Sequence, residues 1–178
     1  MRPHPEHGRD VHYVCAGALR DTSRWPRAQF GSRWLSMILE RMNDPAAIAR
    51  ILRTARTIAV VGLTARTWRP AYRVAAYLQQ AGYRIVPVGP SPEVLGERGY
   101  PDLRSVPLPI DLVDIFRRSD RVRPHVEEAI EIGARAVWLQ VGIRDPEAER
   151  MAEAAGLVVV ADRCTMVEHA RLARARRA

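Results

Sequence analysis

The segment 62–70 carries residue types that bind anions. It reads GLTARTWRP, with one early glycine, two threonines and two arginines. A β-branched apolar run precedes it, and a helical pattern begins at Pro70, so the first amides of that helix would face the same place. Hydroxyls, guanidinium groups and helix amides together favour a phosphate ligand.

The same segment lacks the features of an NAD site. A dinucleotide-binding loop uses three glycines, whereas this loop has only Gly62. NAD sites also place a carboxylate at the end of the second strand, where it binds a ribose hydroxyl. This chain has Val88, Gly89 and Pro90 there, so NAD is disfavoured.

Further arginines follow another predicted strand. The carboxyl ends of parallel strands meet at one edge of a sheet, so these residues and those of segment 62–70 would gather around a ligand with several phosphates. The alternative is that surface arginines flank strands throughout a chain whose basic residues are all arginine. The arginines concerned are Arg66, Arg69, Arg117, Arg118, Arg121 and Arg123.

The elements that would position this loop alternate regularly from residue 43 onward. We expect strands at 58–61, 84–88, 112–116, 136–141 and 157–160, with helices between them. This alternation predicts an α/β, Rossmann-like, doubly wound parallel sheet of five strands with helices on both faces. The expected strand order is 3-2-1-4-5, with a ligand crevice between strands one and four and the long loop 89–111 at its edge.

Length and composition favour one folded domain at 42–178. Residues 1–41 show neither a helical nor an alternating period, so they are either a disordered extension or upstream of a true start at Met37 or Met42. Three histidines there, at positions 4, 7 and 12, lack cysteine or acidic support for a metal site.

Charge and apolar content limit the function classes. The net charge of +8 is the excess of 28 arginines over 20 acidic residues. Most of this excess lies at the two ends of the chain, so nucleic-acid binding by the folded part is disfavoured. Apolar runs such as 157–161 are too short to span a bilayer, and no signal peptide is evident. Two cysteines fit a reducing cytoplasm rather than a disulfide framework.

Residues 162–169 could suggest catalysis. Cys164 follows the fifth predicted strand beside Arg163, but a small packed thiol is the preferred interpretation. Thr165 and Glu168 have the spacing of a capping box, which explains both without acid–base chemistry. His169 has no evident third partner for a nucleophile–base pair with Cys164. A P-loop is also missing, so no catalytic constellation is visible.

Several blocks of the sequence resemble one known family. They are VVGL, RPAYRVAAYLQQAGYRIVPVGP, LGERGYPDL, DLVDIFRRS, VWLQVGI and DRCTMVEHARL. Together they resemble the small stand-alone bacterial CoA-binding proteins, which are related to the N-terminal domain of the succinyl-CoA synthetase alpha subunit. The resemblance runs from Asn43 to Leu172 and implies coenzyme A in the crevice of a Rossmann-like fold.

The resemblance also implies which residues bind CoA. It assigns phosphate binding to the loop after the first strand, the adenosine to the end of the second strand, and the remaining contacts to the third and fourth strand ends. Gly89 departs from the asparagine usual in the family, which removes a side-chain amide contact. The implied residues are Gly62, Leu63, Thr64, Arg66, Arg69, Pro70, Pro87, Val88, Gly89, Pro90, Phe116, Arg117, Arg118, Gln140, Gly142 and Ile143.

The sequence and the resemblance together predict a cytoplasmic protein that binds CoA or an acyl-CoA without chemistry of its own. Three alternatives stay open. The first is a CoA-dependent ligase or transferase component that needs a partner chain, and the second is an NAD(P)-binding or redox-sensing protein. The third is nucleic-acid binding through the arginine-rich ends. A homodimer or another protein partner also stays open.

Overall fold

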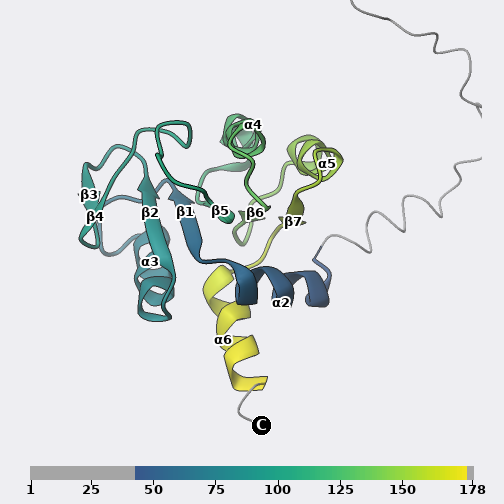
Figure 1. Cartoon of the computed structure of the whole chain (residues 1–178), viewed down its shortest axis with the longest axis horizontal. Coiled ribbons are helices and arrows are strands. Elements are labelled where there is room, and N and C mark those ends of the chain that lie inside the picture. Colours follow the sequence, from purple (N-terminus) through teal and green to yellow (C-terminus); the bar gives the residue numbers. More distant parts are fainter. Residues whose placement is uncertain (1–42, 176–178) are drawn as a thin grey trace, which may run out of the picture.

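The computed structural model describes residues 43–175 (Figure 1). The predictions for residues 1–41, including the histidine tract and the alternative starts, lie outside this range. No helix within the described range is long and apolar enough to cross a membrane.

Helices and strands alternate as predicted. In chain order the elements are α2 (Pro45–Thr54), β1 (Thr57–Val61), α3 (Pro70–Gln80), β2 (Arg84–Val88), β3 (Glu93–Val94), β4 (Glu97–Arg98), β5 (Leu112–Ile115), the 3-10 turn η2 (Ser119–Arg121), α4 (Arg123–Glu131), β6 (Ala136–Leu139), α5 (Pro146–Ala154), β7 (Val158–Val160) and α6 (Thr165–Ala175).

Local sequence signals explain where these helices begin. Asp44 precedes α2, and its carboxylate accepts hydrogen bonds from the backbone amides of Ala46 and Ala47 at 3.0 and 3.2 Å. Asp145 caps α5 in the same way. A proline follows each aspartate at the first helical position, where its missing N–H has no intrahelical partner to lose.

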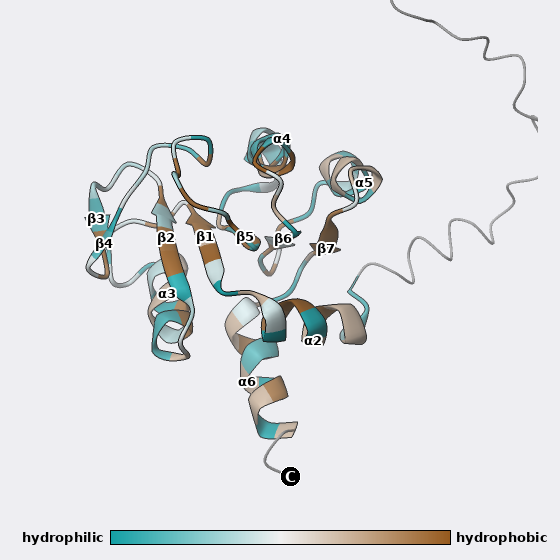
Figure 2. Cartoon of the chain, in the orientation of Figure 1, coloured by the Kyte–Doolittle hydropathy of each residue, from teal (hydrophilic) through white to brown (hydrophobic). Residues whose placement is uncertain are grey.

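Five strands form one parallel sheet, in the order β2-β1-β5-β6-β7. The four residues of β5 and the four of β6 are all buried, as expected for strands covered on both faces. Figure 2 shows apolar residues, in brown, in β1, β2 and β7. The predicted Rossmann-like α/β fold with a doubly wound parallel sheet is therefore confirmed.

The predicted strand order is wrong. The third main strand, β5, pairs with β1 on the side opposite β2, so the main strands lie in the order 2-1-3-4-5. Strand β2 is consequently an edge strand. This place suits Pro87, because a proline within a strand cannot donate a ladder hydrogen bond and is confined to edges. The crevice where the crossovers diverge moves to the junction of β1 and β5.

The helices cover both faces of the sheet, as predicted. Helices α2, α3 and α6 pack on one face around strand residues such as Val60 and Trp138. Helices α4 and α5 pack on the other face around residues such as Val61 and Val137. Figure 1 shows these two helix layers on opposite sides of the strands. The chain leaves β1 toward α3 on one face and leaves β5 toward α4 on the other, which opens the crevice between them.

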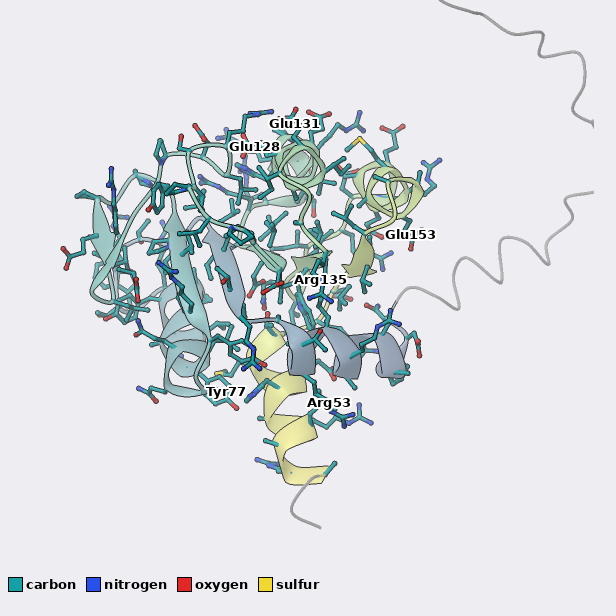
Figure 3. The ribbon with its side chains drawn as sticks, viewed as in Figure 1. Arg53, Tyr77, Glu128, Glu131, Arg135 and Glu153 are labelled. Carbon is teal, nitrogen blue, oxygen red and sulfur yellow. The ribbon has the colours of Figure 1, made fainter. Side chains whose placement is uncertain are left out.

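The long loop 89–111 covers the free edge of β2. Tyr100 exchanges backbone hydrogen bonds with Pro87 and Gly89 at 2.9 and 2.8 Å, and the small β3–β4 hairpin precedes it. Arg104 holds the loop to α4 through Glu128 at 3.1 Å and through Glu131. Figure 3 shows both glutamates on α4. The loop thus protects a sheet edge that would otherwise be open.

Candidate functional site

A cleft of about 680 Å³ opens at the carboxyl edge of the sheet. Residues at the ends of β1, β5 and β6, at the start of α3 and before α6 surround it. They are Gly62, Arg69, Pro70, Ala71, Val74, Phe116, Arg117, Arg118, Ser119, Gln140, Val141, Gly142, Ile143 and Cys164. This is the crevice that the observed strand order places between β1 and β5.

The chain turns sharply at position 62, directly after β1, and only glycine, here Gly62, fits this turn. Its φ is +89°, and a Cβ at this position would lie 2.6 Å from the backbone oxygen of Phe116. Its N–H donates to Val88 at 2.8 Å, which fixes the turn against β2. Only glycine allows this conformation and this close approach of β1 and β5.

The start of α3 lies at the cleft, and within the described structure one of its amides is free. Pro70 has no N–H and the Tyr72 amide donates to the Arg69 oxygen at 3.1 Å, which leaves the amide of Ala71. Arg69 precedes the helix and its side chain makes no capping hydrogen bond, while Arg69, Pro70 and Ala71 all line the cleft. The first-turn amides of a helix have few intrahelical partners, and they lie at the positive end of the helix dipole. This helix end therefore suits a phosphate or another anion.

The cleft is positively charged. Arg69, Arg117 and Arg118 line it, and none of its described lining residues is acidic. Arg118 pairs with exposed Asp120 at 3.0 Å, whereas Arg69 and Arg117 form no ion pair with a described carboxylate. The Nε of Arg117 is buried without a hydrogen-bond partner in the described structure. A buried donor without a partner is costly, and an anionic ligand in the cleft would supply that partner.

The structure brings one group of the predicted residues to the cleft and leaves another group outside it. Leu63, Pro87 and Val88 are buried as whole residues, backbone and side chain alike. The contacts of these three residues with a ligand stay predictions. The predicted residues that line the cleft are Gly62, Arg69, Pro70, Phe116, Arg117, Arg118, Gln140, Gly142 and Ile143; those outside it are Leu63, Thr64, Arg66, Pro87, Val88, Gly89 and Pro90.

Gly89 meets the first loop rather than the cleft. A Cβ at Gly89 would lie 2.8 Å from the backbone oxygen of Leu63. Nearby, the hydroxyl of Ser91 accepts a hydrogen bond from the Ala65 amide at 3.3 Å. The loops after β1 and β2 are therefore in contact, and glycine at position 89 fits the narrow space between them.

A buried polar cluster beside the cleft was not predicted. Asp114 and Thr165 are fully buried, and Gln140 is 6% exposed. The Thr165 hydroxyl donates to Oδ2 of Asp114 at 2.7 Å. Nε2 of Gln140 donates to Oδ1 of Asp114 at 2.7 Å and also to the Thr165 hydroxyl. Burial raises the pKa of Asp114 from 3.8 to about 7, although both hydrogen bonds act to lower it.

The capping-box interpretation of Thr165 and Glu168 is wrong. The Thr165 hydroxyl is occupied by Asp114, and the Glu168 carboxylate accepts a hydrogen bond from Arg163 at 3.0 Å. The Glu168 amide donates to the backbone oxygen of Cys164 at 3.0 Å. A long-range contact of Thr165 and a local ion pair of Glu168 take the place of the pairing that the spacing suggests.

Cys164 and His169 lie in different surroundings. Cys164 is a free, partly buried thiol that lines the cleft. The Nδ1 of His169 is 3.0 Å from the hydroxyl of Tyr77, and its ring also contacts Tyr83 edge-on. Burial lowers the pKa of His169. These contacts give His169 a packing role at the interface of α3 and α6.

A second cavity of about 260 Å³ lies among α2, α6 and the segment after α3. Arg53, Arg56 and His169 are among its lining residues, and Figure 3 labels Arg53 on α2. No carboxyl end of a strand contributes to it. The larger cleft is therefore the candidate site, because ligands of open α/β sheets bind where the strands end and the crossovers diverge.

The fold and the cleft define a class of protein: a Rossmann-like domain with an arginine-lined cleft at the crossover divergence. The family described as CoA binding domain matches residues 56–170, a range that contains every lining residue of the cleft. The chain belongs to this family.

Similar proteins share most of the described range. YneT of Bacillus subtilis (strain 168), named as an uncharacterized protein, is 40% identical over 132 residues, which are 72% of this chain and 98% of YneT. The structure of cell-free ID.343 from Thermus thermophilus is 41% identical, with a TM-score of 0.69, over 72% of this chain and 98% of its own. A hypothetical protein from Pyrococcus horikoshii OT3 is 38% identical, with a TM-score of 0.70, over 75% and 94%.

Proposed function

We propose that this protein binds coenzyme A or an acyl-CoA in the cleft and has no chemistry of its own. The observation that carries the proposal is a cleft with three arginines and no described acidic lining residue, in a chain of the CoA-binding family. CoA carries a diphosphate and a 3′-phosphate, which need several positive partners. Two of the arginines have no described carboxylate partner to displace.

The roles follow from the chemistry of each part of the cleft. The free amide of Ala71 at the start of α3 would bind the diphosphate, with Arg69 beside it. Arg117, whose Nε has no described partner, would bind a phosphate oxygen. Phe116 and Ile143 would contact the less polar part of the ligand.

Isothermal titration of the full chain with CoA, dephospho-CoA and NAD tests the proposal. We expect CoA to bind, dephospho-CoA to bind more weakly because it lacks the 3′-phosphate, and NAD to give no heat of binding. Arg150→Ala removes an exposed arginine of α5 outside the cleft. It is the matched control for Arg117→Ala, which removes an arginine that lines the cleft. Absence of CoA binding, or NAD binding as tightly as CoA, would refute the proposal.

A further inference from the structure

The cluster of Asp114, Thr165 and Gln140 links a buried carboxyl group to the wall of the cleft. Asp114 lies within β5, Thr165 is the first residue of α6, and Gln140 follows β6. Of the three, only Gln140 lines the cleft. Any effect of the other two on a ligand must therefore pass through the Gln140 side chain.

The hydrogen bonds of the cluster fix the orientation of the Gln140 amide. An ionised carboxylate accepts hydrogen bonds but has none to donate, so the amide nitrogen and not the amide oxygen must face Asp114. The second N–H of Gln140 bonds to the Thr165 hydroxyl, whose own proton goes to Asp114. Both amide protons are thus used inside the protein. The carbonyl oxygen Oε1 remains for the cleft, and no described residue donates to it.

We propose that Asp114 and Thr165 are positioning residues that make Oε1 of Gln140 a fixed hydrogen-bond acceptor in the cleft, where it recognises an N–H or O–H donor of the pantetheine arm. This rests on the proposed function. A fully ionised phosphate has no proton to donate to a carbonyl oxygen, so this part of the cleft selects the neutral arm of the ligand. Its other lining residues agree with that, since Phe116, Val141 and Ile143 are apolar.

Protonation of Asp114 releases the constraint. A neutral carboxyl group both donates and accepts, so either orientation of the Gln140 amide then finds a partner. The raised pKa of Asp114 places this change near pH 7. The neighbouring strands present Val60 and Trp138 beside Asp114. Of the charged groups at the start of α6, Arg163 and Glu168 pair with each other, and within the described residues no charge contributes to the pKa of Asp114.

The test measures the affinity of the full chain for two ligands between pH 6 and pH 8.5. CoA carries the pantetheine arm, whereas adenosine 3′,5′-bisphosphate carries nucleotide phosphates without it. The variants are Asp114→Asn, which satisfies either amide orientation, and Gln140→Met, which removes the acceptor at similar volume. Glu131→Gln, on the exposed side of α4, is the control.

At pH 8 we expect Gln140→Met to bind CoA about fivefold to tenfold more weakly, the value of one hydrogen bond. Asp114→Asn should bind CoA about twofold more weakly, because two satisfied amide orientations halve the fraction of protein that presents Oε1. Both variants should bind the bisphosphate as the wild type does. The wild-type preference for CoA over the bisphosphate should decrease toward pH 6 and stay constant in both variants. Ligand phosphates titrate identically for every variant, so the comparison isolates Asp114.

Two results separate the possible failures. If the wild type binds CoA but the variants keep its affinity and pH profile, or lose affinity for both ligands equally, the positioning role is refuted and the proposed function stands. If the wild type does not bind CoA at any pH, the proposed function is refuted and this inference with it.

Discussion

The substitution Asp114→Asn should stabilise the protein at alkaline pH. In the unfolded chain the carboxyl group ionises near its ordinary pKa of 3.8, whereas burial raises its pKa to about 7 in the folded protein. The folded state therefore holds a proton that the unfolded state has lost between these values. The contribution of Asp114 to stability is therefore highest below pH 3.8, decreases as the pH rises toward 7 and is constant above that.

The size of the effect follows from the same two pKa values. Each unit of pKa is worth about 1.4 kcal/mol, so above pH 7 the buried charge costs about 4 kcal/mol. Asparagine removes this cost, but the Thr165 hydroxyl loses its acceptor, which costs about 1 kcal/mol. We expect the variant to be about 3 kcal/mol more stable than the wild type at pH 8, and about 0.6 kcal/mol more stable at pH 5.

Urea denaturation of both proteins at several pH values between 5 and 8.5 measures this difference. The two histidines with lowered pKa, His125 and His169, also make stability depend on pH, but they are present in both proteins and cancel. A difference in unfolding free energy that stays constant across this range would refute the reasoning. So would a variant that is less stable than the wild type at pH 8.

Other expected outcomes concern the cleft and its first turn. Arg117→Ala should weaken CoA binding by about 1.5–3 kcal/mol in calorimetry, and Arg66→Ala, outside the cleft, by less; equal losses would contradict the cleft boundary. Gly62→Ala should lower the free energy of unfolding by about 1–3 kcal/mol, more than Gly133→Ala, where φ is also positive but no atom lies within 4 Å of the added Cβ. Denaturant titration compares the two. CoA affinity should also fall steadily as sodium chloride is raised, and an affinity independent of salt would argue against phosphate–arginine contacts.

The sequence predicts the fold class because each strand and helix has its own local signal. Asp44 and Asp145 mark helix starts, and short apolar runs mark buried strands. Strand order is different, since alternation of strands and helices does not say on which side of β1 the third strand will pair. Pro87 is the residue that indicates the order, because a proline within β2 predicts an edge strand and so excludes a partner on its second side.

The sequence predicts the loop residues that line the cleft, but it does not predict the buried polar cluster beside the cleft. Residues such as Gly62 and Arg117 follow strands, and the carboxyl ends of parallel strands meet at one edge whatever their order. Asp114 lies inside an apolar run, and this pattern predicts only that it belongs to a strand. Its partner Thr165 is 51 residues away, and a local capping motif explained that threonine equally well. A charged residue in a fully buried strand was the available signal, because such a group needs partners.

A crystal structure of the full chain grown with excess CoA tests the central claim most directly. The proposal predicts electron density for CoA in the cleft, with its diphosphate at the start of α3 and a phosphate oxygen at Arg117. CoA bound elsewhere on the molecule, or a cleft without electron density for CoA at saturating concentration, would contradict the proposal.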